Sequence, residues 1–383
     1  MCAHEAISEA LRSYLRGVRD ALAAAVGSAT TTRTRLIAGL EPSELEGATA
    51  LEECLADLLA SGGKMIRPRA LYLGYLAATV SGPPAPASPP APASPLDPAD
   101  AAARAAGDDR LIRLGCAVEL LHVFGLLQDD VMDQGATRRG RPTAHQHLAG
   151  RHDAAGARGD SHRFGESLAV LAGDLAFALA QRQLRGLPSA VCVAWDDMVV
   201  ELVQGQRLDL VFAAEGRFDQ ASTLAVAQAK TAAYSVARPL ELGALLARPD
   251  QPVPAWLGTF GACAGEAFAL ADDLLGVFGD PAVTGKPVAD DIRQRKPSTV
   301  LGIAEDVLGG AVTQLLGPQR PTPTEPQIEQ LRRAMANGGV QREAERRLSR
   351  CLTEAEAAVA DLGCVAVGGE LLRWARGLAR RAA

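Results

Sequence analysis

The stretch that decides the fold is Leu111–Val131, LIRLGCAVELLHVFGLLQDDV. Its apolar residues recur at steps of three and four, which is the repeat of one face of an α-helix. The pattern predicts a long buried helix that ends beside the acidic residues Asp129 and Asp130.

The composition extends this prediction to the whole chain. Hydrophobic residues make up 48% of the 383 residues and aromatic residues only 4%, so the core consists of Ala, Leu and Val, a mixture that favours helices over strands. Helices are expected over residues 2–60, 166–214 and 220–246, with a Gly- and Ala-rich loop over 149–165. The fold class predicted is all-α, a helical bundle.

A Pro-rich segment interrupts the helical pattern. Residues 81–100, SGPPAPASPPAPASPLDPAD, contain eight prolines, which exclude a helix interior. A disordered Pro/Ala-rich loop is expected over 81–108. Because the sequence on both sides is of the same helical kind, we expect one domain over 1–383.

Charge and hydropathy narrow the choice of partners. The formal net charge of −6 gives no reason to expect nucleic acid. We found no charge-free apolar run of the roughly 18 residues that span a bilayer, so no transmembrane segment is expected. The N-terminal stretch resembles an amphipathic helix more than a signal peptide, and a soluble cytoplasmic enzyme is expected. The seven scattered cysteines are expected to be reduced.

The helix end at Asp129 is unusually acidic. Asp129 and Asp133 lie one turn apart on the same face of a helix, with Asp130 beside them. Like charges at that spacing destabilise a helix by roughly 0.2–0.5 kcal/mol. A cation is therefore expected nearby, although a solvated helix end is the alternative. Arginines follow in the sequence at 138, 139 and 141.

A second acidic pair favours a metal. Asp272 and Asp273 end another apolar helical segment, FALADDLLGVF. Two such helix ends supply the oxygen ligands of Mg²⁺, with phosphate as the usual further ligand. The basic residues near loops and helix ends are candidates to bind that phosphate: Lys64, Arg67, Arg138, Arg139, Lys230, Lys286 and Lys296.

Six motifs in order carry a family resemblance. They are GGKMIRP, ELLHVFGLLQDDVMDQGATRRGRPTAH, RFGESLAVLAGDLAF, ELVQGQRLDL, AKTAAYSVARPLELGALLA and FALADDLLGVFGDPAVTGKPVADDIRQRK. From about residue 10 to 380 the chain resembles the polyprenyl synthetase family of trans-isoprenyl diphosphate synthases. The resemblance implies the isoprenoid synthase fold with a central active-site cavity, and a homodimer.

The resemblance also implies a reaction and roles for the residues. The family condenses isopentenyl diphosphate with allylic diphosphates (dimethylallyl, geranyl, farnesyl) to linear prenyl diphosphates. It implies that Mg²⁺ is held by the carboxylates Asp129, Asp130, Asp133, Asp272 and Asp273. The allylic diphosphate would be held by Arg138, Lys230, Lys286 and Lys296, with Thr231 facing the cation, and isopentenyl diphosphate by Lys64, Arg67, His122 and Arg139.

In the family that the chain resembles, product length depends on the residues just before the first aspartates. Phe124 is an aromatic five residues before Asp129, and Gly125 is a small residue four before it. This pattern is similar to that of geranylgeranyl diphosphate synthases and implies a twenty-carbon product, with farnesyl diphosphate as the alternative.

Three departures from the family pattern leave other functions open. Met65 stands where Arg is frequent, Gln128 where His is usual, and Ala269 where Gln is usual. They motivate the alternative of a weakly active partner subunit of a heteromeric synthase. A terpene cyclase is the other alternative, but it has no use for a second diphosphate clamp.

Overall fold

The computed structural model describes residues 3–41, 43–81, 97–138, 140–279 and 289–380. Contacts group the chain into two compact units, and each is described by itself. The first unit comprises Met1–Glu9, Ala70–Ala105 and Pro188–Ala383, and the second comprises Ala10–Arg69 and Ala106–Leu187. The expected single domain stays a prediction.

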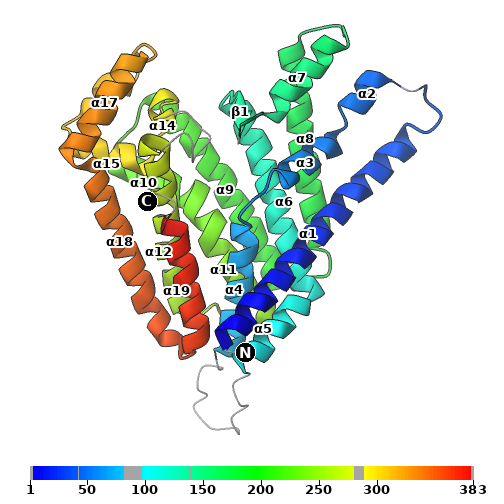
Figure 1. The fold of residues 1–383 in the computed structure, drawn as a ribbon, viewed down its shortest axis with the longest axis vertical. Coiled ribbons are helices and arrows are strands. Elements are labelled where there is room, and N and C mark those ends of the chain that lie inside the picture. The colour runs from blue at the N-terminus through cyan, green and yellow to red at the C-terminus, as the bar shows by residue number, and fades with distance from the viewer. Residues whose placement is uncertain (1–2, 42, 82–96, 139, 280–288, 381–383) are drawn as a thin grey trace. The chain divides into compact units, whose positions relative to one another are not determined.

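The predicted all-α class is confirmed (Figure 1). The elements up to residue 183 are α1 (Ala3–Leu36), α2 (Glu44–Ala48), α3 (Leu51–Ala60), α4 (Ile66–Val80), α5 (Pro98–Gly107), α6 (Asp109–Met132), β1 (Thr137–Arg138), β2 (Arg141–Pro142), α7 (Ala144–Ala154) and α8 (Ser161–Gln183). Those that follow are α9 (Ser189–Glu215), α10 (Gln220–Val226), the π-helix η1 (Ala227–Ala237), α11 (Arg238–Ala247), α12 (Ala255–Phe278), α14 (Asp290–Arg293), α15 (Thr299–Val307), α16 (Ala311–Leu316), α17 (Glu325–Gly338), α18 (Val340–Val359), the 3₁₀-helix η2 (Ala360–Leu362) and α19 (Val365–Ala379).

Helices α6 and α8 pack against each other in the second unit and lie side by side in Figure 1. Each begins at an aspartate N-cap, Asp108 and Asp160, whose side chain accepts a hydrogen bond from a backbone N–H of the first turn. Their close approach depends on Gly173, where an added Cβ would come within 2.9 Å of the Gln128 amide nitrogen. The helix predicted from Leu111–Val131 is thus confirmed as the core of this unit.

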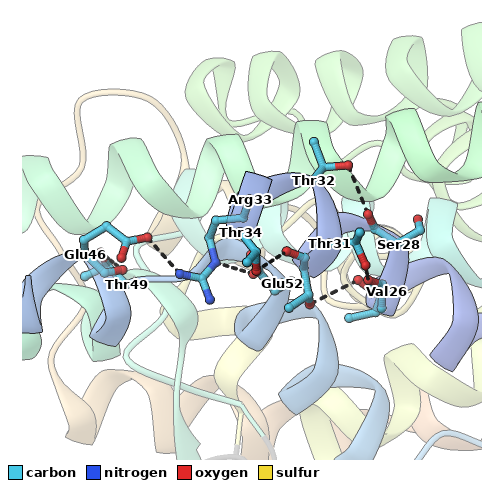
Figure 2. Close-up of polar contacts among 11 residues, drawn as sticks. Val26, Ser28, Thr31, Thr32, Arg33, Thr34, Glu46, Thr49 and Glu52 are labelled. Atoms are coloured by element: carbon cyan, nitrogen blue, oxygen red, sulfur yellow. Dashed lines mark hydrogen bonds and ion pairs between the residues drawn. The ribbon is translucent and has the colours of Figure 1, made fainter. Parts of the chain in front are cut away.

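The C-terminal part of α1 is fixed to α2 and α3 by one arginine. The Arg33 guanidinium donates to Glu46 at 2.8 Å and to Glu52 at 2.5 Å (Figure 2). Glu52 is buried, and hydrogen bonds with the two glutamates raise the pKa of Arg33 above its ordinary value. Threonine hydroxyls of the same helix end donate to backbone carbonyls one turn earlier.

The first unit contains a glycine-mediated contact between α4 and α11. A Cβ at Gly74 would lie 2.0 Å from the backbone oxygen of Leu240, and a Cβ at Gly243 would lie 2.0 Å from that of Leu71. The two backbones therefore touch directly, which only glycine permits. Helix α12 packs on η1 and on α18.

Several sequence predictions need correction. Residues 98–107 form α5, so the loop predicted over 81–108 is wrong there; residues 82–96 lie outside the described part. The loop predicted over 149–165 is helical over 149–154 and from Ser161. The helical stretch predicted over 166–214 consists of two helices, α8 and α9, separated between Gln183 and Ser189, where Pro188 precedes α9.

Two helices, α6 and α8, are long and apolar enough to cross a membrane by length and composition alone. The most apolar 18-residue stretch of each helix is 61% buried in α6 and 39% buried in α8. The core helix of a soluble protein meets the same criteria, so the two helices are weak evidence for a membrane span. The expected absence of a transmembrane segment and the expected cytoplasmic location stay predictions. No disulfide joins the six described cysteines, and their expected reduced state stays a prediction.

Candidate active site

The first acidic cluster lies at the C-terminal end of α6. Asp129 and Asp130 belong to its last turn, and Asp133 is the C-cap, whose N–H donates to the Asp129 carbonyl at 2.8 Å. Asp130 is buried, whereas Asp129 and Asp133 are half-buried. The cluster therefore consists of one enclosed carboxylate and two that water reaches.

Arg138 binds the enclosed carboxylate in a bidentate pair. Its Nε lies 2.9 Å from both carboxylate oxygens of Asp130, and its Nη2 lies 2.6 Å from Oδ1. The same Nη2 is 3.7 Å from an oxygen of Asp129. The cation expected beside the aspartates is thus Arg138, although it was predicted to bind diphosphate and not a carboxylate.

The local backbone brings Arg138 back to the helix end. β1 and β2 form a two-residue antiparallel ribbon in which Arg138 pairs with Arg141. The turn between them contains Gly140, whose φ of +74° suits glycine. The N–H of Gly135 donates to the Asp130 carbonyl, and the Thr143 hydroxyl donates to the Gly135 carbonyl at 2.6 Å, so the returning chain is held at both ends.

The acidic neighbours of Arg138 favour its charged form. Burial by itself lowers the pKa of the Arg138 guanidinium, but the hydrogen bonds with Asp130 and the charges of Asp129 and Asp133 outweigh burial and raise it. Charge-assisted bidentate pairs of this kind are short and geometrically specific. Arg138 is therefore a permanently charged group at the mouth of the cluster.

The second acidic cluster lies near the end of α12. Asp272 is exposed, and Asp273 accepts a hydrogen bond from the Thr299 N–H at 2.6 Å. Burial raises the pKa of Asp273 well above its ordinary value, and the nearby charges of Asp291 and Asp272 add to this rise. The carboxylate of Asp291, from α14, lies directly over Gly276, where a Cβ would meet its Oδ2 at 2.4 Å.

Lys230 lies on η1 in the first unit. Its Nζ is 2.5 Å from an oxygen of Asp209, a buried residue of α9. Gly205 of α9 lies against the backbone of Ala229 and Lys230, where a Cβ would be 2.7 Å from the Lys230 nitrogen. The neighbouring residue Thr231 is half-buried. Helix α9 thus positions the lysine through a glycine contact and an ion pair.

The predicted isopentenyl diphosphate clamp is described in part, and all its described members belong to the second unit. Lys64 is exposed, Arg67 is 8% exposed, and His122 is half-buried. His122 lines a largely apolar pocket of about 450 Å³ with Met65, whose φ is +49°. Arg139 lies outside the described residues.

The other described candidates lie on α6, on α12 and just after α14. Lys296 is half-buried and its N–H donates to the Asp291 carbonyl at 3.0 Å, whereas Lys286 lies outside the described residues. Phe124 is half-buried and its ring centroid lies 5.4 Å from that of Phe177 on α8; Gly125 is half-buried beside it. Ala269 is buried in α12.

The predicted metal ligands are of the chemical kind that Mg²⁺ binds. All five predicted ligands are carboxylates, the hard oxygen donors that Mg²⁺ prefers. Among the described residues, however, no group of three His, Cys, Asp or Glu side chains is close enough to hold a metal by itself. Asp130 accepts from Arg138, and Asp273 accepts from the Thr299 N–H. The residues therefore fit an ion that takes its other ligands from phosphate and water, as Mg²⁺ commonly does.

Three residues that the sequence did not single out contact the predicted site residues: Asp209 pairs with Lys230, Asp291 lies near Asp273, and Phe177 packs on Phe124. Asp209 lay within the quoted ELVQGQRLDL motif, and Asp291 lay within the last motif. Phe177 ended the third motif. The motifs contained all three, but their partners depend on helix packing, which spacing along the chain does not reveal.

Comparisons with known proteins identify the class. The family described as Polyprenyl synthetase matches residues 48–313. A (2E,6E)-farnesyl diphosphate synthase of Mycobacterium bovis is 39% identical over 203 residues, 51% of each chain. A geranylgeranyl diphosphate synthase of Mycobacterium tuberculosis is 38% identical over 223 residues, 56% of this chain and 59% of that one.

A solved structure covers more of the chain. The geranylgeranyl pyrophosphate synthase of Corynebacterium glutamicum, complexed with isoprenyl diphosphate and magnesium, has a TM-score of 0.77 and 29% identity, over 97% of this chain and 99% of that one. The chain thus belongs to the polyprenyl synthetase family, and the predicted resemblance is confirmed. The chain spans about half the length of the first curated relatives it matches.

Proposed function

We propose that the protein is a trans-prenyltransferase that condenses isopentenyl diphosphate with an allylic diphosphate in the presence of Mg²⁺. The observation that carries this proposal is the end of α6, where Arg138 binds Asp130 and leaves Asp129 and Asp133 accessible to water. In a chain of this family, half-buried carboxylates beside a charged guanidinium are suited in charge and chemistry to bind a metal–diphosphate group.

The proposed reaction begins with breakage of the carbon–oxygen bond of the allylic diphosphate. Bound Mg²⁺ would supply neutralisation of the charge that develops on the leaving diphosphate, held by Asp129, Asp130, Asp133, Asp272 and Asp273. Arg138, Lys230, Lys286 and Lys296 would bind the same group. Because Lys230 is paired with Asp209, its ammonium is held in one orientation before substrate arrives.

The second substrate needs a separate clamp. Lys64, Arg67, His122 and Arg139 would bind the diphosphate of isopentenyl diphosphate so that its double bond faces the allylic carbon. The alkene attacks that carbon, a carbon–carbon bond forms, and a proton is lost to the departed diphosphate. Thr231 would face the cation, and apolar walls would exclude the water that quenches it.

The proposed product is geranylgeranyl diphosphate, with farnesyl diphosphate as the alternative. The relatives bear both names. Phe124 is the residue expected to stop chain growth, and Gly125 beside it leaves the neighbouring position open. Phe124→Ala is expected to lengthen the product; an unchanged distribution would exclude Phe124 as the stop.

The proposed partners follow the family. A homodimer is proposed, and the cytoplasm is the proposed location. A terpene cyclase would use one diphosphate only, so the second clamp argues against it. A weakly active partner subunit remains the alternative that Met65, Gln128 and Ala269 motivate, whereas the aspartates of both motifs are present.

The test is incubation of the purified protein with Mg²⁺, labelled isopentenyl diphosphate and each allylic starter, followed by chromatography of the dephosphorylated products. Geranylgeraniol is expected. Absence of elongation from folded protein with every starter would overturn the proposal in favour of a partner subunit. A cyclic hydrocarbon made without isopentenyl diphosphate would instead indicate a cyclase.

A further inference from the structure

The turn that follows α14 has an arginine at a position where helix ends usually have glycine. Arg295 has a φ of +55°, in the left-handed region that residues with a Cβ rarely adopt. The Arg295 N–H donates to the Ile292 carbonyl at 3.2 Å, and the Lys296 N–H donates to the carbonyl of Asp291 at 3.0 Å. These two bonds form the common C-terminal cap of a helix, whose left-handed position favours glycine. The turn is therefore strained, and a contact outside it must stabilise it.

Helix α14 does not supply this stabilisation by itself. It has four residues, Asp290–Arg293, and so short a helix is unstable alone. The residue before it, Ala289, also has a left-handed φ, of +58°. Ile292 is completely buried in a core shared with residues of α12, α15 and α17. The core thus fixes one residue of α14, whereas Arg295 lies beyond the last helical residue.

The Arg295 side chain is bound to the segment between α16 and α17. Its Nη2 donates to the carbonyl of Arg320 at 3.0 Å and also to the carbonyl of Pro321. This segment is stiff, because Pro321 and Pro323 fix φ and Thr324 begins α17 with a capping box. A charged guanidinium that binds two carbonyls of a stiff segment holds its own backbone in place.

The turn at Arg295 lies between two contacts with the second acidic cluster. Before the turn, the Asp291 carboxylate lies directly against a glycine of α12. After the turn, the Thr299 N–H donates to Asp273 at 2.6 Å. Lys296, which we propose to bind the allylic diphosphate, follows Arg295 directly. A change in the turn therefore displaces a carboxylate, a lysine and a hydrogen-bond donor of the cluster together.

We propose that Arg295 is a positioning residue for the allylic diphosphate site. Its bonds to the segment between α16 and α17 hold the strained turn that carries Asp291 and Lys296 at the second acidic cluster. The inference rests on the proposed function and deepens it, because it gives that segment a role in the site. Arg295 acts on the turn and does not touch the substrate. When its side chain is removed, the turn relaxes and the groups that bind Mg²⁺ and diphosphate are displaced.

The experiment measures binding of inorganic pyrophosphate with Mg²⁺ by isothermal titration calorimetry, using the whole 383-residue chain. Arg295→Met removes the donor and keeps the strain, so the dissociation constant is expected to rise about tenfold, as when a group that orients a metal site is lost. Arg295→Gly also removes the donor but adopts the left-handed turn without strain, so its affinity is expected to stay close to that of the wild type.

Steady-state kinetics provide the second measurement. The KM for the allylic starter is expected to rise in Arg295→Met and to recover in Arg295→Gly. The KM for isopentenyl diphosphate is expected to stay unchanged in both variants, because its proposed clamp consists of other residues. If Arg295→Met does not fold, Arg295→Lys replaces it and is expected to give a smaller rise in the same direction.

Arg293→Met is the matched control. Arg293 forms a bidentate pair with Glu325, in which its Nε and Nη2 each lie 2.9 Å from a carboxylate oxygen. The Glu325 side chain is 71% exposed, and exposed ion pairs contribute little. Because Arg293 belongs to α14 itself and not to the left-handed turn, Arg293→Met is expected to bind Mg²⁺ and pyrophosphate as the wild type does.

The outcomes separate the two levels of proposal. A wild-type protein that binds Mg²⁺ and pyrophosphate but elongates no starter overturns the proposed function alone, and one that does neither overturns both proposals. Wild-type affinity in Arg295→Met overturns the positioning role. Equally weak binding in Arg295→Met and in folded Arg295→Gly also overturns it, because the guanidinium would then act on the ligand and not on the turn.

Discussion

The two acidic clusters use the same residue type but differ in what surrounds it. At the end of α6, the buried carboxylate of Asp130 is bound by the Arg138 guanidinium at 2.6 Å. Near the end of α12, Asp273 receives one backbone N–H, from Thr299, and the next carboxylate, that of Asp291, adds to the repulsion that raises its pKa.

Because the two clusters differ in counter-charge, we expect Mg²⁺ to stabilise them to different extents. The first cluster carries its own counter-charge, so it is expected to keep its conformation without an ion. The second cluster gathers negative charge in a partly buried position, which is unfavourable unless a cation or a proton is added. We therefore expect the second cluster to gain more stability from Mg²⁺ than the first.

The largest loss of stability is expected when the counter-charge of the first cluster, Arg138, is removed. Arg138→Met leaves the buried Asp130 carboxylate without its partner, and this is expected to lower the free energy of unfolding by about 3–5 kcal/mol. Urea unfolding followed by circular dichroism measures the effect. Elongation activity is expected to fall as well, because Arg138 also faces the proposed diphosphate site.

A double variant serves as the control for this effect. Asp130→Asn/Arg138→Met removes both charges and is expected to recover most of the lost stability, since replacing both members of a buried pair is often close to neutral. A double variant as unstable as Arg138→Met would mean that the lost packing of Arg138, and not the uncompensated charge, explains the first result.

In the second cluster, Gly276 has little room for a side chain. A Cβ at Gly276 would lie 2.4 Å from Oδ2, 2.7 Å from Cγ and 2.8 Å from Oδ1 of Asp291, so the whole carboxylate would have to move. Gly276→Ala is therefore expected to cost about 1–3 kcal/mol in thermal or urea unfolding, the range of overpacking. Gly276→Ala/Asp291→Ala removes the clash and is expected to restore stability. Equal losses in both variants would contradict this contact.

These contacts indicate how much of the molecule the sequence predicts. The apolar repeat over Leu111–Val131 was sufficient to predict α6, and the spacing of Asp129 and Asp133 was sufficient to predict one acidic face. The ribbon that returns Arg138 onto Asp130 was not predicted, because a two-residue strand has too few residues to show a repeat.

Other failures have physical causes of the same kind. The helix predicted over 220–246 contains the π-helix η1 between α10 and α11, and a change from one helical hydrogen-bond pattern to another leaves the apolar spacing almost unchanged. The ring pair of Phe124 and Phe177 depends on the register between two helices. Periodicity describes one helix at a time and does not contain that register.

The expected response to metal is tested by neutralising one carboxylate in each cluster. Asp273→Asn removes charge from the crowded cluster while the amide oxygen still accepts from Thr299, so the metal-free protein is expected to melt at a higher temperature. The stabilisation by Mg²⁺ with inorganic pyrophosphate is expected to shrink. Asp129→Asn is the matched variant, and it is not expected to stabilise the metal-free protein, because Asp129 lies 3.7 Å from Arg138. A rise in both variants would contradict the difference between the clusters.

The smallest change in stability is expected at Gly173 of α8, which packs against α6, the helix that carries the first cluster. A Cβ at Gly173 would lie 2.9 Å from the Gln128 amide nitrogen, which is the far end of a flexible side chain. The amide can rotate away, and alanine gains about 1 kcal/mol of helix propensity over glycine, so Gly173→Ala is expected to change the free energy of unfolding by less than about 1 kcal/mol. Urea unfolding beside Gly276→Ala measures the contrast directly. A loss at Gly173 as large as that at Gly276 would mean that α6 and α8 are packed as rigidly as α12 and α14, and that the two clusters differ in charge but not in steric tolerance.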